Sequence, residues 1–123
     1  MDPISVFSLA GGLLFLSAVC SFLAASMASG ELPRNNAVGI KTKHTQASDE
    51  AWLAGHEAAA ATVKRAGLAG WAVLLGVSVL CIFRLWPWAM GLAGLGYVLL
   101  IGLTLVATSK ANKAASSSGE LPR

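Results

Sequence analysis

The sequence predicts an all-α membrane protein with three transmembrane helices and a structured cytoplasmic loop that carries an amphipathic helix. Of the 123 residues, 55% are hydrophobic and only 12% are charged, a balance well outside that of soluble domains. Three stretches contain no charged residue, and each meets or nearly meets the roughly 20 residues that cross the hydrocarbon core. One long polar connection, residues 28–65, follows the first stretch. A chain of this length forms one domain at most, which we place at 1–123.

The first span is expected near residues 4–27. The chain before it carries Asp2 and no Lys or Arg, and the uncharged run is longer than the apolar core of a typical signal peptide. The small residues Ala24–Ala28 do resemble a cleavage site, so a cleaved signal peptide is the alternative. We favour a retained helix.

The second and third spans are expected near residues 66–85 and 89–109. The second is the shortest, and basic side chains at its two ends can extend its reach by snorkelling to the headgroups. Pro87 lies between two Trp residues, which suit the interfacial aromatic belt. We therefore place the turn between the two spans at Pro87.

The distribution of Lys and Arg predicts the orientation. The basic residues of the 28–65 connection and of the C-terminal tail all fall on one side of the membrane, and only Arg84 falls on the other. By the positive-inside rule the loop and the C-terminus are cytoplasmic and the N-terminus lies outside. The net charge of +3 is explained by this bias and by anionic lipid, so it implies no nucleic-acid partner. The lipid bilayer is the partner that the composition itself predicts.

Small residues recur four apart in every span, a spacing that lets helix backbones approach closely. They favour tight contacts inside the chain or with a partner, although Ala and Gly are abundant enough that some pairs arise by chance. The members are Ser17, Ser21, Ala25, Ala66, Gly70, Ala72, Gly76, Ala89 and Ala93. No Asp, Glu, Lys or His lies inside a span, which disfavours a channel or proton-coupled transporter. The two cysteines, Cys20 and Cys81, should lie at different depths, and no disulfide is expected.

The polar connection is longer than a hairpin between adjacent spans requires, which is typical of functional or structured loops. Its first half is rich in turn residues, and regular structure should begin at Ser48, which can cap a helix over about 49–63. This helix either lies along the membrane surface or continues into the second span. Its apolar face should pack against other helices or the headgroup layer, with Trp52 as anchor. That face contains Trp52, His56, Ala59, Ala60 and Val63.

His56 is the side chain with the widest chemical range in the loop. It could bind a metal, carry a proton or sense pH, and His44, Asp49 and Glu50 lie close to it in sequence. The spacing matches no strong metal motif, so a histidine hydrogen-bonded to the loop, or to Thr42, Thr45 or Asn36, is the preferred interpretation. No nucleophile elbow, P-loop, dinucleotide fingerprint or zinc-protease pair occurs, so we expect no enzyme activity, no cofactor and no metal.

The run NNAVGIKTKHTQASDEAWLAGHEAA, residues 35–59, resembles the signature of the SdpI family. The pattern is an Asn-rich start, a Gly-Ile-Arg-Thr-like stretch, a Thr, and a Trp followed by a His on a helix. The matching positions, which we expect to bind a partner or to fold the loop, are Asn35, Asn36, Gly39, Lys41, Thr42, Thr45, Trp52 and His56. Lys41 replaces the expected Arg, which keeps the charge but loses the planar fork.

The resemblance covers one span, the motif loop and two further spans. The family is named for a longer bacterial immunity protein against a secreted peptide toxin, which also signals the toxin's presence by holding a repressor at the membrane. It implies a non-enzymatic protein of the bacterial cytoplasmic membrane, of immunity or signalling type, that acts through its cytoplasmic loop with other membrane subunits or a cytoplasmic regulator. The alternatives are an accessory subunit of a larger membrane complex and a small transporter.

The C-terminal tail, residues 110–123, is small and polar in composition, and we expect it to be mobile unless a partner holds it. It ends in a second copy of the hexapeptide SGELPR, which also occurs at residues 29–34. A local duplication, an artificial scar and a repeated binding peptide all fit this repeat.

Overall fold

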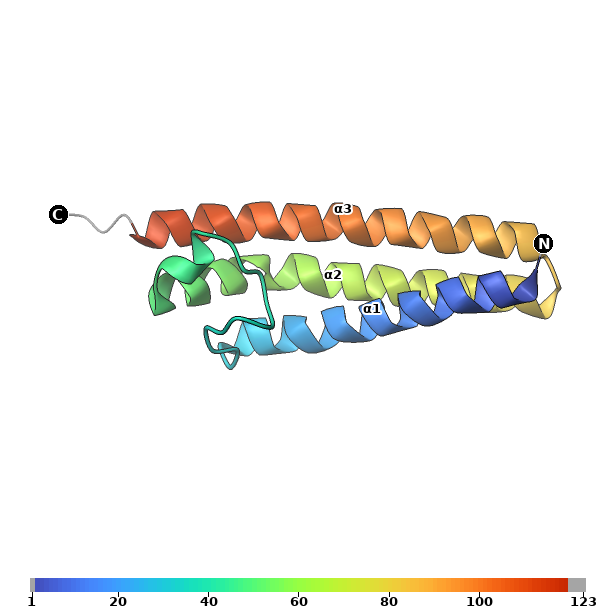
Figure 1. The fold of residues 1–123 in the computed structure, drawn as a ribbon, viewed down its shortest axis with the longest axis horizontal. Helices are drawn as coiled ribbons and strands as arrows, with labels where there is room; N and C mark the ends of the chain where they lie inside the picture. Colours follow the sequence, from blue (N-terminus) through green and yellow to red (C-terminus); the bar gives the residue numbers. More distant parts are fainter. Residues whose placement is uncertain (1, 120–123) are drawn as a thin grey trace.

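The computed structural model describes residues 2–119 and contains three long helices joined by one long loop and one tight turn (Figure 1). Helix α1 covers Pro3–Ser29, a short 3₁₀ helix η1 covers Thr45–Ala47, α2 covers Asp49–Ile82 and α3 covers Trp86–Gly119. All three long helices are long and apolar enough to cross a membrane, so the chain is an all-α membrane protein. We call the end that carries the loop the loop end and the opposite end the turn end.

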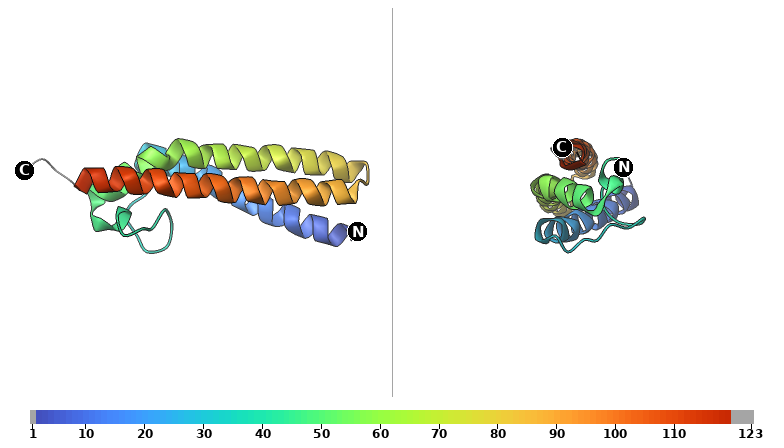
Figure 2. Two further views of the ribbon diagram at one scale, coloured as in Figure 1. Left: turned by 90° about the horizontal axis from the view of Figure 1, so that it is seen from above. Right: turned by 90° about the vertical axis from the view of Figure 1, so that its left-hand side faces the viewer.

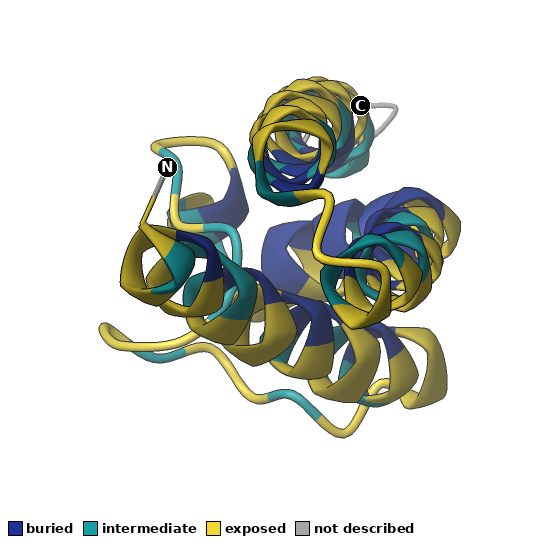
Figure 3. Cartoon of the chain, turned by 90° about the vertical axis from the view of Figure 1, so that its right-hand side faces the viewer, coloured by how far each residue is buried: buried dark blue, intermediate teal, exposed yellow. Residues whose placement is uncertain are grey.

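Helices α2 and α3 form an antiparallel pair along their whole length, and α1 lies obliquely across them (Figures 1 and 2). Helix α1 packs mainly on α2. Seen from the turn end, buried residues face the space between the helices and exposed residues cover the outside (Figure 3). Many large apolar side chains are on that outside, including Phe15, Phe22, Leu75 and Leu105, each more than half exposed. This pattern is expected when lipid, rather than water, surrounds the bundle.

Small residues allow the close approach of α1 and α2. An added Cβ at Gly70 would lie 1.9 Å from Ser17 Oγ, and one at Gly67 would lie 2.8 Å from Ser21 Oγ. Ser17 is fully buried and donates its hydroxyl to the Leu13 carbonyl of its own helix at 2.7 Å. The predicted role of the small residues is therefore confirmed here for contacts inside the chain.

Near the turn end, α1 and α3 are joined by a polar contact. The Tyr97 hydroxyl donates to the Leu9 carbonyl at 2.6 Å, and Gly12 leaves the room that the Tyr97 ring needs. The rings of Phe7 and Trp86 also form a T-shaped pair, with centroids 5.9 Å apart. Two apolar clusters fill the bundle, one around Leu13 at this end and one around Met27 at the loop end.

The turn between α2 and α3 lies earlier than predicted. Residues 83–85 form it, and the Leu85 amide closes it by donating to the Leu80 carbonyl at 2.9 Å. Arg84 takes the left-handed conformation, with φ of 58°, that glycine usually takes after a helix. The placement of the turn at Pro87 was wrong, because Pro87 lies in the first turn of α3, where the missing N–H has no helical partner to lose.

The loop helix predicted over 49–63 is the first part of α2, so it continues into the second span. Its start is as expected, since the Ser48 side chain accepts a hydrogen bond from the Ala51 amide at 3.0 Å. The predicted apolar face is confirmed, because all five of its members are buried.

The predicted mobility of the tail is wrong for residues 110–119, which continue α3 without a break. Ala111 and Ala115 are buried, and an added Cβ at Gly55 would lie 2.9 Å from the Ala111 carbonyl oxygen. Small side chains on both helices thus let the tail pack against α2. Residues 120–123, which hold most of the second SGELPR copy, lie outside the described residues. The first copy contains Gly30, whose φ of 74° ends α1.

Candidate functional site

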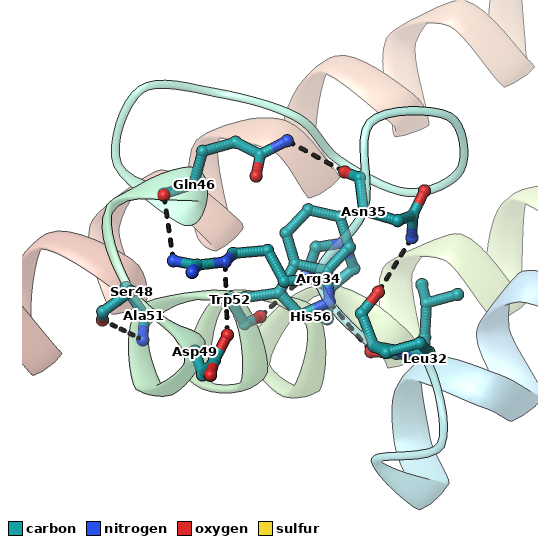
Figure 4. A network of polar contacts seen from close by, with 10 residues as sticks. Leu32, Arg34, Asn35, Gln46, Ser48, Asp49, Ala51, Trp52 and His56 are labelled. Carbon is teal, nitrogen blue, oxygen red and sulfur yellow. Dashed lines mark hydrogen bonds and ion pairs between the residues drawn. The ribbon is translucent and has the colours of Figure 1, made fainter.

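The candidate site is at the loop end, where the loop folds against the start of α2 and the end of α3. We call residues 30–63 together with residues 110–119 the cap. Trp52 and His56 are one helical turn apart on α2, and their rings are stacked with centroids 4.0 Å apart (Figure 4). Both side chains are almost completely buried. The Trp52 Nε1 group donates to the Leu32 carbonyl at 2.9 Å, which attaches the segment just after α1 to α2.

Both ring nitrogens of His56 have backbone partners. Nε2 accepts a hydrogen bond from the Ile40 amide at 2.9 Å, and Nδ1 lies 2.8 Å from the Trp52 carbonyl oxygen. Since a carbonyl can only accept, these partners assign a neutral ring with its proton on Nδ1. Burial lowers the pKa of His56, against a smaller raising effect of the Trp52 carbonyl. His56 lies on the part of α2 before the uncharged stretch. The expected hydrogen bond to the loop is confirmed by the Ile40 amide, whereas Thr42, Thr45 and Asn36 are not its partners.

Gly39 closes this site on the loop side. Its φ is 119°, and an added Cβ would lie 2.8 Å from His56 Nε2 and 3.0 Å from the Trp52 ring. The loop backbone therefore rests directly on the stacked rings, and only glycine fits both the conformation and the space.

Thr42 and Thr45 fold the next part of the loop. The Thr42 amide donates to Thr45 Oγ1 at 2.9 Å, and the Thr45 amide points back to Thr42 Oγ1 at 3.2 Å. Thr45 is fully buried and its hydroxyl donates to the Ile40 carbonyl at 2.7 Å. The Thr42 hydroxyl also donates to Asn112 Oδ1, which attaches the loop to α3.

Asn35 organises the loop tip. Its Oδ1 accepts from the amides of Ala37 and Val38 at 2.8 and 2.7 Å, which is an Asx turn. Its own carbonyl accepts from Gln46 Nε2 at 3.0 Å, so the tip is joined to η1 (Figure 4). Arg34 forms an ion pair with Asp49 at 3.2 Å, and the Asp49 side chain is highly exposed.

The structure divides the eight predicted residues into two groups. Six of them, all except Asn36 and Lys41, fold the loop through hydrogen bonds or close packing. Asn36 and Lys41 are exposed, and Lys41 Nζ donates to the Asn36 carbonyl at 2.9 Å. In the part of the chain that the structure describes, no group of three or more His, Cys, Asp or Glu side chains gathers into a metal-binding arrangement.

Sequence reasoning missed the contribution of α3 to the cap. Asn112 bonds Thr42, and Lys110 Nζ donates to Thr62 Oγ1 on α2 at 2.9 Å. A signal was present, because Ala107, Ala111 and Ala115 continue the four-residue spacing of small residues beyond the apolar stretch. That spacing predicts a helix packed closely on a neighbour, whatever its polarity.

The comparisons with known proteins agree with this motif. A family model described as the SdpI/YfhL protein family matches residues 31–108, which include the loop, all of α2 and most of α3. No curated protein and no solved structure matches the chain. Since the match covers more than half of the sequence, the chain belongs to the SdpI/YfhL protein family.

Proposed function

We propose that this protein is a non-enzymatic membrane receptor of the immunity or signalling type, and that its cap faces the cytoplasm and transmits the signal. The observation that carries the proposal is that the loop, which continues directly from α1, is hydrogen-bonded to both α2 and α3. Trp52 holds the segment after α1, His56 holds Ile40 onto α2, and Thr42 reaches Asn112 on α3. A movement of α1 against the other two helices, caused by a peptide at the membrane, would therefore change the loop.

The exposed part of the cap offers a surface for a cytoplasmic regulator. Asn36, Lys41, Lys43 and His44 are all exposed and close in sequence. Lys41 is the cation among the eight positions that match the family pattern, and its partner in the chain is a backbone carbonyl. Such a group can exchange that partner for a carboxylate of a regulator at little cost, because an exposed hydrogen bond contributes little stability.

A survival experiment tests this role. The gene is deleted from its host, and the strain is challenged with peptides secreted by the same species and complemented with variants. The wild-type chain and Lys113→Gln, which removes an exposed charge elsewhere on the cap, should restore survival, whereas Lys41→Gln with Asn36→Ala should restore it only in part. Full sensitivity that no form of the chain relieves, or equal survival without the gene, would exclude an immunity role.

The orientation is tested separately by cysteine labelling. Cys20 and Cys81 are replaced by Ala, and single cysteines are placed at Glu50 and Glu57, both exposed. Intact cells should protect these positions from a reagent that cannot cross the membrane, and broken cells should expose them. Labelling in intact cells would place the cap outside and contradict the proposal.

An accessory subunit of a larger membrane complex is the second candidate. The observation that favours it is the open face of α3, where an added Cβ at Gly91, Gly94 or Gly102 meets nothing within 4 Å. Glycines on an outer helix face allow a partner helix to approach. Purification in mild detergent with one stoichiometric membrane partner, lost on Gly94→Leu but kept on Val98→Leu, would favour this candidate.

A further inference from the structure

A groove of about 790 Å³ runs between α1 and α2 near the loop end, and none of the hydrogen bonds that fold the cap involves its lining residues. Its walls are mostly alanine, with Ala24, Ala25 and Ala28 on α1 and Ala60 and Ala61 on α2. These small apolar side chains leave room for part of a ligand to lie between the two helices. The polar groups that line the groove are few, and their order along the bundle is informative.

The groove has two charged lining residues, Glu57 and Lys64, seven positions apart on α2. Seven residues are almost two helical turns, so both lie on one face, about 10 Å apart along the axis. Within residues 2–119, neither forms an ion pair. Lys64 lies two residues before the uncharged part of α2 begins at Ala66, and Glu57 lies further out, in the cap.

The groove also contains a hydroxyl, which lies closer to the middle of the bundle than Lys64 does. Ser21 lines the groove from α1 and is level with Gly67, since an added Cβ there would lie 2.8 Å from Ser21 Oγ. Trp71 Nε1 donates to this oxygen at 3.0 Å. The Ser21 hydroxyl proton donates to no acceptor among the described residues, so it is available to an oxygen in the groove. Gly67 follows Lys64 by three residues, which is about 4.5 Å of helix.

We propose that the groove binds a zwitterionic phospholipid whose headgroup carries a primary ammonium. From the membrane outward, such a lipid presents acyl chain, ester carbonyl, phosphate and ammonium. In the same direction the groove presents the apolar side chain of Leu68, the Ser21 hydroxyl, the Lys64 cation and the Glu57 anion. Its alanines lie between the levels of Ser21 and Glu57, beside the positions of the headgroup. Lys64 binds the phosphate, Ser21 donates to an ester carbonyl, and Glu57 binds the ammonium.

Charge complementarity selects this lipid over other occupants. A lipid with a net negative headgroup would meet Glu57 as a like charge, which disfavours it. A second copy of the chain or another helix would have to bring its own partners for both charges. The inference does not depend on the proposed receptor role, since it concerns the lipid surface of the bundle alone.

The experiment uses the full chain in nanodiscs made of equal parts phosphatidylethanolamine and phosphatidylglycerol. After release into detergent, native mass spectrometry measures which lipid stays bound and with what stoichiometry. We expect one phosphatidylethanolamine per chain, well above its share in the disc. The Glu57→Gln and Lys64→Gln variants should each lower this preference about fivefold. Matched controls are Glu50→Gln and Arg65→Gln, which remove exposed charges that do not line the groove.

A steric variant separates groove binding from headgroup attraction. Ala61→Leu fills the groove and should abolish retention of the lipid, while Ala58→Leu, also exposed but outside the groove, should leave it unchanged. Equal retention of the two lipids, or retention that Ala61→Leu does not affect, overturns the proposal. Loss of a dimer in Ala61→Leu would also overturn it, since a second copy would then occupy the groove.

Discussion

Helices α1 and α2 meet in the middle of the bundle through residues that are almost without side chains, whereas at the loop end the chain is held by side chains that reach across. In the first region Gly67 and Gly70 face Ser21 and Ser17 so closely that a methyl group could not be added. In the cap, hydrogen bonds join residues far apart in sequence, as between Thr42 and Asn112. The contact between α1 and α2 therefore depends on small side chains, whereas the cap depends on specific polar side chains.

The difference follows from the surroundings of each region. Between spans in lipid there is little hydrophobic gain from association, so close backbone packing provides the attraction. At the loop end the irregular backbone has polar groups that must be satisfied, and side chains such as those of Trp52, His56 and Thr45 satisfy them. Larger side chains should therefore destabilise the contact between α1 and α2, and loss of a polar group should destabilise the cap.

The largest effect is expected for Gly70→Leu. An added Cβ already lies 1.9 Å from Ser17 Oγ and 3.0 Å from its Cβ, so α1 and α2 must separate. We expect a loss of about 3 kcal/mol in the free energy of unfolding, the upper part of the range for overpacking. Titration with SDS, followed by circular dichroism, measures it. Gly91→Leu is the control, since nothing lies within 4 Å there, and an equal loss in both variants would refute the close contact.

Gly39→Ala should have the next largest effect, confined to the cap. The φ of 119° and the contacts with His56 and Trp52 both oppose a side chain, and we expect a cost of about 2 kcal/mol. Trypsin should cut the loop at Lys41 and Lys43 much faster than in the wild-type protein, while SDS unfolding of the spans changes little. Asn36→Ala, at an exposed loop position, should be cut at the wild-type rate. A cap that resists trypsin despite Gly39→Ala would show that the loop can move away from the rings.

The pH dependence of the cap is a smaller effect with a definite sign. Burial lowers the pKa of His56 below its ordinary value of 6.5, so the unfolded cap binds a proton more readily than the folded one. The stability that the neutral His56 gives to the folded cap is therefore fully present above pH 6.5. It decreases as the pH falls below 6.5 towards the pKa of His56 in the folded cap. A protonated Nε2 would also face the Ile40 amide as a second donor. Hydrogen exchange should show less protection of the Ile40 amide at pH 5 than at pH 7.5.

Two variants test whether His56 causes this pH dependence. Replacing His44, which is exposed, by Gln should leave the change in protection between pH 7.5 and pH 5 intact. His56→Gln should remove the change, at the cost of lower protection throughout. A pH dependence that survives in His56→Gln would have to come from another group.

The smallest effect is expected for Arg34→Gln. The ion pair with Asp49 is exposed on both sides, and such pairs contribute less than about 0.5 kcal/mol. Trypsin resistance of the remaining loop sites should fall only slightly, and by less at 0.5 M NaCl than at low salt. A loss as large as that of Gly39→Ala would mean that the ion pair, rather than the stacked rings, holds the loop.

The sequence was sufficient for the three helices and for the buried face of the loop helix, because both depend on local patterns of hydrophobicity. It was also sufficient for the motif residues, six of which fold the loop. It predicted that His56 bonds to the loop, but it did not identify the partner atoms. His56 binds two backbone groups, and the partner of Thr42 lies 70 positions away. Contacts of this kind depend on where the tertiary fold places a segment, which composition does not record.

The tail was the clearest error, and it has a physical reason. Composition rules relate small polar residues to disorder because such residues bury little apolar surface. Ala111 and Ala115 bury little area each, yet their small size lets α3 approach Gly55 on α2. Close backbone packing thus orders residues 110–119, although their hydrophobicity alone does not predict a packed helix.

The unbroken course of α2 has a mechanical consequence. The seventeen residues from Asp49 to Arg65 are continuous with the apolar part of the helix and extend about 25 Å beyond it. A stiff rod of that length acts as a lever, so a tilt of about 10° inside the membrane displaces its far end by about 4 Å. Displacements of that size exceed the tolerance of a hydrogen bond. A small change in how the helices lean in the bilayer would thus become a change of partners at the loop.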